Sequence, residues 1–293
     1  MSTAQLFLLC TAIWGTTWIA ITFQLGVVDV PASIAYRFAI ASALLFAYVR
    51  VRGLWRPQCL VDHLTAALMA AFFAVNYGLV YFAEGALPSG LVAVSSATIF
   101  FFNIVLARVL FGTRVTPALA AACVVGIAGV VCVYADEVFG ASLEGRGLAA
   151  LGALIGAFLS SCANMAAQKL GARGVPVLVT NTLWMFYVTL FMCLFVVVTP
   201  ATFAFSFTPG YVLSLLYLAL FGSLVAFGAF FTLLGRVGAG PAGYVAVTTP
   251  VIALVVSSFV EDLSWPWTRV LGVACILVGQ VALLRARSKV PNA

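Results

Sequence analysis

The sequence is poor in charged residues. Of its 293 residues only 8% are Asp, Glu, Lys or Arg, whereas 65% are apolar or aromatic, and the mean hydropathy is +1.19. Soluble domains carry about 25% charged and about 45–50% apolar residues, so a water-soluble globular domain is excluded. Ten membrane spans of ~20 residues would use about 200 residues and leave no room for a separate soluble catalytic domain.

Reactive side chains are also scarce. His63 is the single histidine, and the seven cysteines show no CxxC or other paired spacing. Cysteines within apolar runs behave as small hydrophobes, so we expect neither disulfides nor a metal site. No P-loop pattern is present, which argues against direct use of ATP. The fourteen Lys and Arg are spread too thinly for a nucleic-acid-binding face. The sequence therefore predicts no cofactor, no metal and no nucleic-acid partner.

What the sequence has in abundance is long apolar runs. Ten of them, separated by Pro, Gly or charged residues, predict transmembrane helices. The first run is longer than the ~7–15-residue core of a signal peptide and no Lys or Arg precedes it, so we interpret it as a span. The predicted spans cover residues 3–24, 31–49, 64–84, 88–110, 117–135, 147–169, 178–199, 211–234, 241–260 and 268–285.

The basic residues are distributed unequally across these spans. Only Arg146 and Arg269 fall on the side opposite the N-terminus, and Arg37 falls inside the second span. The positive-inside rule therefore predicts that both termini of this multi-pass protein are cytoplasmic. The membrane that we expect is a bacterial inner membrane. The eleven basic residues on the N-terminal side are Arg50, Arg52, Arg56, Arg108, Arg114, Lys169, Arg173, Arg236, Arg285, Arg287 and Lys289.

The two halves of the chain resemble each other. Residues 92–97 (VAVSSA) recur as residues 245–250 (VAVTTP), an offset of 153 that also maps Gly126 onto Gly279. This pattern indicates a duplication, with one repeat in residues 1–142 and the other in residues 143–293.

Five spans per repeat is an odd number, so the second repeat must be inserted upside down. We predict an all-α polytopic membrane protein with ten transmembrane helices arranged as two inverted five-helix repeats. Secondary transporters use this architecture for alternating access, with the substrate near the membrane midplane between the repeats.

Several short motifs add a family resemblance. They are residues 14–18 (WGTTW), Tyr36-Arg37-Phe38, Gly85-Ala86-Leu87, Thr249-Pro250, and Glu261 followed by Gly272 and Gly279. With these motifs the chain resembles, over about residues 5–285, the ten-span EamA-domain proteins of the drug/metabolite transporter superfamily. The resemblance implies a cavity surrounded by spans one to four and six to nine, with spans five and ten peripheral.

The chain departs from the family pattern at two places in the first repeat. Ala97 stands where the pattern has a proline, and residues 111–114 (FGTR) lack the expected glutamate. These departures affect the functional symmetry of the repeats rather than the fold.

Arg37 lies inside the second predicted span, and Glu84 lies at the outer end of the third. Arg37 lies six residues after Pro31, which at 1.5 Å per residue places it about 9 Å inside the span, a depth comparable to that of Glu84. Charged residues within spans are costly and point to function. One hypothesis is an ion pair that closes the external mouth. The alternative is that Arg37 binds backbone carbonyls or snorkels while Glu84 caps an interface.

Pro250 in the middle of the ninth span removes a backbone hydrogen bond. It forms either a hinge or a static kink, and with Arg37 and Glu84 it completes the predicted gating set.

Aromatic and polar side chains form the predicted substrate site. Trp14 and Trp18 share a helix face, and Tyr77 and Tyr81 follow the same spacing. In hydrocarbon such polar groups need partners, so they either bond neighbouring helices or face a wet cavity, and Trp18 also suits an interfacial belt. Further polar positions are Ser95, Ser96, Asn103 and Thr249. The predicted substrate-binding residues are Trp14, Trp18, Asn76, Tyr77, Tyr81, Thr98, Tyr244 and Thr248.

These features predict a secondary transporter that exports small metabolites, with amino acids or related zwitterions first, since phosphate recognition usually needs several Lys or Arg. Proton antiport, facilitated diffusion and exchange all stay open, because no acid or histidine lies near midplane. The partners are a small polar or amphipathic metabolite and membrane lipid, in a monomer or weak homodimer. The alternatives are a lipid flippase or scramblase of the same fold, and a lipid-modifying enzyme that would use the outer acids Asp136, Glu137 and Glu144, which otherwise form a solvated loop.

Overall fold

Helices account for nearly all of the computed structural model, which describes residues 1–113, 115–136, 146–237 and 242–287. Seven helical segments are long and apolar enough to cross a membrane, and three shorter apolar helices complete ten spans. The helices are α1 (Thr3–Thr22), α2 (Val30–Val51), α3 (Leu60–Glu84), α4 (Ser89–Ser96), α5 (Ile99–Phe111), α6 (Pro117–Val133), α8 (Arg146–Ala172), α9 (Val177–Val198), α10 (Pro209–Leu216), the π-helix η1 (Tyr217–Val225), α11 (Ala226–Val237), α13 (Tyr244–Val260) and α14 (Trp267–Arg287).

Local sequence signals explain where several spans begin and end. α1 starts with a capping box, in which the Ser2 hydroxyl accepts from the backbone N–H of Gln5 and the Gln5 side chain accepts from the backbone N–H of Ser2. The Thr116 hydroxyl caps α6 by accepting from the N–H of Leu119. Gly112 ends α5 in the left-handed conformation, with φ of 69°, which glycine adopts without strain.

The fourth and eighth spans are each divided. Ala97 and Thr98 separate α4 from α5, and their N–H groups bond to the carbonyls three residues earlier, at 3.0 Å each. Ala97 is the repeat equivalent of Pro250, yet α13 runs without interruption through Pro250. The first repeat therefore breaks its helix without a proline, and the second keeps its helix with one. In the eighth span the interruption is η1, nine residues of π-helix.

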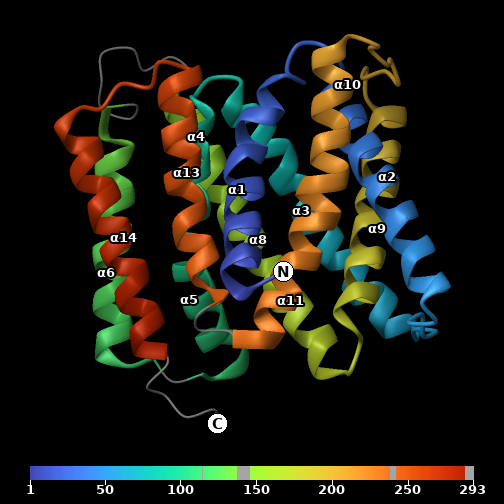
Figure 1. Ribbon diagram of the computed structural model, residues 1–293, viewed down its shortest axis with the longest axis horizontal. Helices are drawn as coiled ribbons and strands as arrows, with labels where there is room; N and C mark the ends of the chain where they lie inside the picture. Colours follow the sequence, from blue (N-terminus) through green and yellow to red (C-terminus); the bar gives the residue numbers. More distant parts are fainter. Residues whose placement is uncertain (114, 137–145, 238–241, 288–293) are drawn as a thin grey trace.

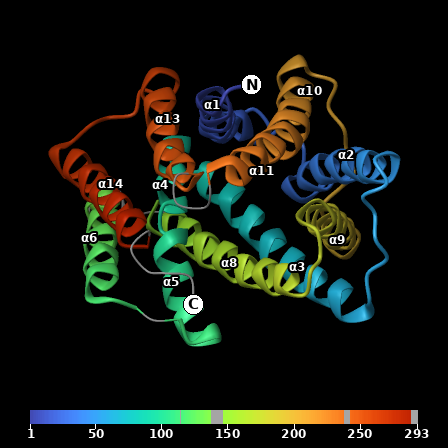
Figure 2. The ribbon, with the colours of Figure 1, turned by 60° about the horizontal axis from the view of Figure 1, so that its bottom comes forward.

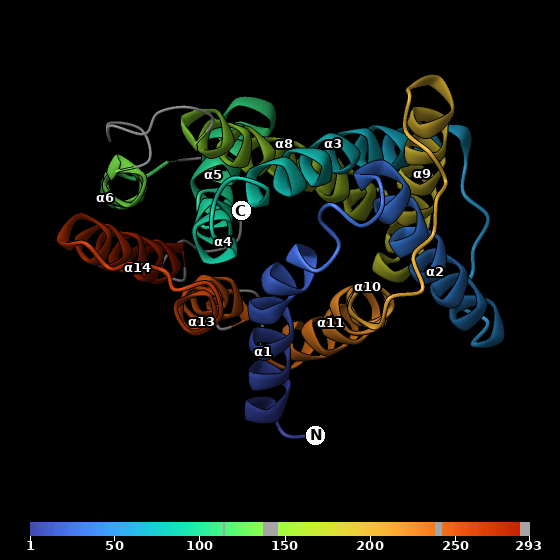
Figure 3. The same cartoon turned by 90° about the horizontal axis from the view of Figure 1, so that it is seen from above.

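The spans lie roughly side by side, with a helix pair at each edge of the molecule (Figures 1 and 2). α6 and α14 form one edge, and α2 and α9 form the other. Viewed from above, α1, α3, α4, α8, α11 and α13 lie between these edges (Figure 3). The beginning of α1 and the end of α14 lie toward the same side of the molecule (Figure 1), as an even number of spans requires.

The contact between α6 and α14 displays the inversion of the repeats. Val133 of α6 meets Gly272 of α14, whereas Gly126, nearer the start of α6, meets Gly279, farther along α14. The two helices are therefore antiparallel, although they occupy equivalent places in the two repeats. Gly126 and Gly279 are themselves equivalent at the offset of 153. Small residues permit this close approach, as at other helix interfaces within membranes.

The outward faces of the spans are apolar, as a lipid-facing surface requires. Leu8, Val124, Val197 and Phe259 expose more than 60% of their surface. Lipid surrounds a membrane protein as the apolar solvent, so these side chains need no protein partner. The chain is a multi-pass membrane protein.

Candidate functional site

A cavity of about 380 Å³ lies among the central spans. It is lined by residues of α1, α2, α3, α4, α5, α8, η1, α11 and α13, so both repeats contribute. Its volume falls within the about 300–1,000 Å³ typical of small-molecule sites. As the resemblance implied, spans five and ten do not line it. The seventh span, α9, does not line it either and instead packs behind α2 and α3, where Trp184 lies against Phe38 and Phe73.

Half of the predicted binding residues line this cavity: Trp14, Trp18, Asn76 and Tyr77. The centroids of the Trp14 and Phe227 rings lie 5.2 Å apart. Nε1 of Trp14 donates to the carbonyl of Gly222 at 3.1 Å. Gly222 lies within η1. π-helical turns displace the regular hydrogen bonds and are frequent at functional sites. Here the π-helix leaves a carbonyl that fixes an aromatic wall of the cavity.

The other predicted binding residues do not line the cavity. The Tyr81 hydroxyl is buried and donates to Oε1 of Gln24 at 2.6 Å, so it ties α3 to the end of α1. Thr98 and Thr248 donate to carbonyls of their own spans. These hydroxyls are therefore satisfied locally. Tyr244 lies at the first turn of α13, outside the cavity.

One wall of the cavity was not predicted from the sequence. Ala153, Ala157, Ser160 and Asn164 of α8 form a stripe with the spacing of one helix face. Two are small and two are polar, and this combination at helical spacing is the signal that could have revealed the wall. The residues Thr17, Phe73, Phe100 and Phe227 were also missed, whereas Ser95, Ser96, Asn103 and Thr249, noted as polar positions, all line the cavity.

A polar cluster joins α5 to α8 at one end of the cavity. Oδ1 of Asn103 accepts from the Ser161 hydroxyl at 2.6 Å and from Nδ2 of Asn164 at 3.4 Å. Asn103 and Asn164 both line the cavity. Because unpaired amides are costly in hydrocarbon, these bonds fix the two helices against each other at this end.

Arg37 lines the cavity, but the proposed Arg37–Glu84 ion pair is not formed in this structure. Within the described residues, Nε and Nη1 of Arg37 and both carboxylate oxygens of Glu84 have no hydrogen-bond partner. Arg37 instead lies over the rings of Tyr77 and Phe38, at 5.1 and 5.2 Å. Glu84 is buried at the end of α3 and does not line the cavity.

A second carboxylate fastens the outer ends of two helices. Glu261 ends α13, and its carboxylate accepts from the N–H of Ser89 at 3.0 and 3.1 Å and from the Ser89 hydroxyl at 2.6 Å. It also accepts from the Ser257 hydroxyl at 2.6 Å. Ser89 begins α4, so the carboxylate lies at a helix N-terminus, where negative charge is favourable.

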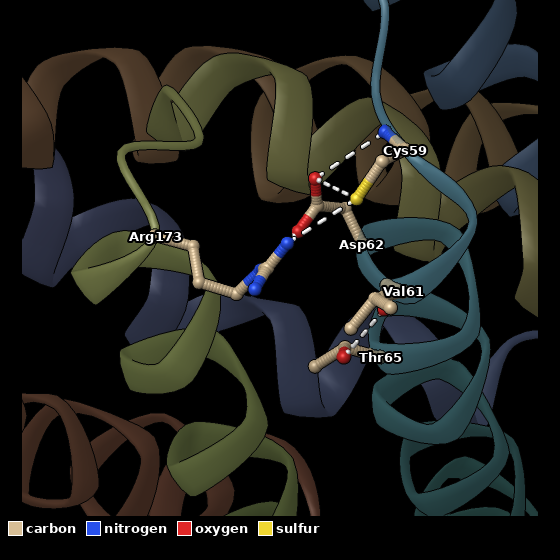
Figure 4. A network of polar contacts seen from close by, with 5 residues as sticks. All are labelled: Cys59, Val61, Asp62, Thr65 and Arg173. Carbon is tan, nitrogen blue, oxygen red and sulfur yellow. Dashed lines mark hydrogen bonds and ion pairs between the residues drawn. The ribbon is translucent and has the colours of Figure 1, made fainter.

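On the opposite side of the molecule, α3 is tied to the loop after α8 (Figure 4). Nε of Arg173 donates to Oδ1 of Asp62 at 2.5 Å, and Asp62 also accepts from the backbone N–H and thiol of Cys59. The Asp62 carboxylate raises the pKa of Arg173 above its usual value. The Thr65 hydroxyl donates to the carbonyl of Val61 one turn into α3. This network closes the helix ends on the side predicted to be cytoplasmic.

The described residues hold no group of three His, Cys, Asp or Glu able to bind a metal ion. Of the three acids considered as an enzyme site, Asp136 accepts from the Thr268 hydroxyl at 3.1 Å, and Glu137 and Glu144 lie outside the described residues.

Comparison with known proteins defines the class. The EamA-like transporter family matches residues 1–135 and 147–285. The chain therefore belongs to this family, which is part of the drug/metabolite transporter superfamily, and it carries two EamA repeats. Family membership confirms the predicted inverted-repeat fold and makes the chain a transporter rather than an enzyme.

Two curated relatives from Escherichia coli (strain K12) are similar over most of their length. A protein named "Probable amino-acid metabolite efflux pump" is 25% identical, and the match covers 94% of this chain and 92% of the relative. A protein named "Uncharacterized inner membrane transporter YedA" is 29% identical, with coverage of 84% and 78%. A crystal structure that is 17% identical superposes with a TM-score of 0.68 over 99% of both chains, a likeness of fold.

Proposed function

We propose that this transporter exports small metabolites, amino acids or related zwitterions first, from the cytoplasm across a bacterial inner membrane. The observation that carries the proposal is the cavity of about 380 Å³ between the two repeats, whose walls are aromatic and neutral polar side chains. Aromatic rings bind apolar side groups, and amides and hydroxyls satisfy polar ends. The name of the 25% identical relative, an amino-acid metabolite efflux pump, supports the same substrate class.

Alternating access between the inverted repeats is the proposed mechanism. A small polar cluster around Glu261 holds the outer ends of α4 and α13 together. The Asp62–Arg173 network holds the inner ends of α3 and α8, and the proposed substrate cavity lies between the two clusters. Opening one of these clusters at a time would expose the cavity to one side of the membrane. Glu84, Arg37 and Pro250 form the proposed gating set. The Arg37–Glu84 pair would form in a conformation in which α2 and α3 shift at their outer ends.

The proposed orientation has both termini in the cytoplasm. The eleven basic residues on the N-terminal side support it, because translocating Lys and Arg is disfavoured. In this orientation the Asp62–Arg173 network is cytoplasmic and the Glu261 cluster is external.

Reconstitution tests the function directly. Purified protein in liposomes preloaded with unlabelled amino acids should accelerate uptake of labelled amino acids at least tenfold over protein-free liposomes. Ala157→Phe, which fills the cavity from α8, should remove this exchange. Val124→Phe, which adds a ring of the same size at a side chain 67% exposed to lipid, is the matched control and should leave exchange intact.

The same liposomes separate the competing functions. Labelled lipid redistributed between leaflets, with no movement of amino acids, would contradict metabolite transport and favour a flippase or scramblase. Equal exchange by wild type and Ala157→Phe would show that the cavity is not the transport path.

A further inference from the structure

Arg37 is a buried charge that forms no salt bridge within the described residues. The side chain is only 5% exposed, and within the described part of the chain Nε and Nη1 make no hydrogen bond. A buried ion without a partner costs several kcal/mol, and in membrane proteins such residues normally mark substrate or ion pathways. A gating pair does not remove this cost in the conformation described, because Glu84 and Arg37 form neither a hydrogen bond nor a salt bridge here.

The surroundings of Arg37 hold the guanidinium in position without a salt bridge. The hydroxyl of Tyr81, a neutral group, interacts with the guanidinium. Tyr77 and Phe38 place their rings 5.1 and 5.2 Å from its central carbon. Cation–π contacts orient a guanidinium and leave its N–H donors available. A Cβ added at Gly222 would come within 3.8 Å of Nη2. The absence of a side chain at this position in η1 keeps that approach open.

Arg37 is also the single charged residue in the cavity lining that the structure describes. The polar residues that share the lining, such as Asn76, Ser160 and Asn164, are neutral. One guanidinium matches one carboxylate, with two parallel N–H···O bonds. Among the described residues, no carboxylate lines the cavity to bind an ammonium group, so an amine would meet neutral oxygens and ring faces there.

We propose that Arg37 binds the carboxylate of the transported solute, and that the cavity therefore selects organic carboxylates, including amino acids, over their amides and over amines. This proposal rests on the proposed function, because it assigns a substrate feature to the same cavity. The aromatic walls, with Trp14, Phe73 and Phe100, would hold the apolar part of the solute. The proposal is compatible with a gate, since Arg37 can exchange the solute carboxylate for that of Glu84 as the helices move.

Ligand binding to purified wild-type protein and two Arg37 variants tests the proposal. The probes are L-phenylalanine, L-leucine and 3-phenylpropionate as carboxylates, the amides of the two amino acids, and phenethylamine. Binding is measured by quenching of tryptophan fluorescence, with Trp14 and Trp18 as reporters in the lining, and checked by thermal shift. The variants are Arg37→Gln and Arg37→Lys. Val124→Ala, at a lipid-facing side chain of α6 outside the cavity lining, is the control.

At least one carboxylate should bind wild type about 10- to 100-fold more tightly than its amide or amine counterpart, the range expected for a bidentate charged pair. Arg37→Gln should remove this preference, Arg37→Lys should retain part of it, and Val124→Ala should leave the ratio unchanged. Because the readout is a ratio within each variant, Arg37→Lys keeps the test informative even if Arg37→Gln fails to fold.

The contrary results are distinct. Equal affinity of acids and amides in wild type, or an undiminished preference in both Arg37 variants, would overturn the role of Arg37 while leaving amino-acid transport standing. Binding of no carboxylate at all would also overturn it. Binding of 3-phenylpropionate through Arg37 without transport of any amino acid would uphold the carboxylate site and contradict the proposed substrate class.

Discussion

Removing the Glu261 carboxylate should release the outer end of α4 from α13. In the structure this carboxylate accepts from both the N–H and the hydroxyl of Ser89, and these bonds cross between the two repeats. The helices also pack closely at this point, because a side chain at Gly90 would come within 2.7 Å of Cβ of Ser257. Glu261→Ala removes the polar tie and leaves this packing surface intact, so the change isolates the contribution of the carboxylate.

The magnitude follows from the bonds that are lost. Hydrogen bonds to a charged group contribute about 1.5–3 kcal/mol, and a carboxylate at a helix N-terminus adds about 0.3–1 kcal/mol. We therefore expect the docked arrangement of these helix ends to lose about 2–4 kcal/mol, which corresponds to a shift of ~30- to 700-fold in the equilibrium between docked and separated ends. The global fold should survive, since the core of the spans is untouched.

Hydrogen–deuterium exchange provides the assay, because local opening sets the exchange rates of protected amides. Peptides covering residues 91–96 should exchange at least ~30-fold faster in Glu261→Ala, within the range calculated above. Peptides from α6 should be unchanged. Glu261→Gln keeps an acceptor oxygen for Ser89 and should show a smaller increase. Ser257→Ala removes only a bond from α13 to its own end and should show the least change.

Unchanged protection of residues 91–96 in Glu261→Ala would refute this reasoning. It would mean that packing at Gly90 alone holds the helix ends together. Faster exchange throughout the molecule, including α6, would equally refute it, because the carboxylate would then support the whole fold rather than one pair of helix ends.

Three further predictions follow from the structure. Reporter fusions after Arg52 and at the C-terminus should score cytoplasmic and a fusion after Glu144 external; an external C-terminus would contradict the orientation. Tyr77→Ala, which removes a cavity wall and a cation–π contact, should lower transport at least tenfold with little change in melting temperature. Tyr81→Phe, which leaves Oε1 of Gln24 without its donor, should instead cost about 1 kcal/mol of stability and spare transport, and the reverse pattern would show that their roles are exchanged. Gly272→Leu, whose Cβ would lie 2.6 Å from the carbonyl of Gly129, should destabilise the protein by about 1–3 kcal/mol, seen as a lower melting temperature; an unchanged melting temperature would show that α14 can shift away from α6.

The sequence by itself determined the class of protein and its architecture. Apolar runs of about 20 residues have few alternatives to membrane helices, because only helices and closed barrels satisfy the backbone in lipid. An odd number of spans in a duplicated chain requires inversion, whatever the packing. The WGTTW and Thr249-Pro250 motifs pointed to the family that the comparison then showed. These conclusions depend on composition, hydrophobic periodicity and internal repetition, which can be read along the chain without knowing which helices are in contact.

Which residues face the cavity was decided only by the tertiary structure. Tyr77 and Tyr81 share one stripe by helical spacing, yet Tyr77 lines the cavity and Tyr81 bonds to Gln24. A stripe identifies a face of a helix, but the rotation of that face toward the cavity or a neighbouring helix is set by packing with helices distant in sequence. The break at Ala97 shows the same limit, because no proline marks it. Whether Arg37 and Glu84 form an ion pair likewise depends on where Glu84 comes to lie, which spacing along two separate spans does not specify.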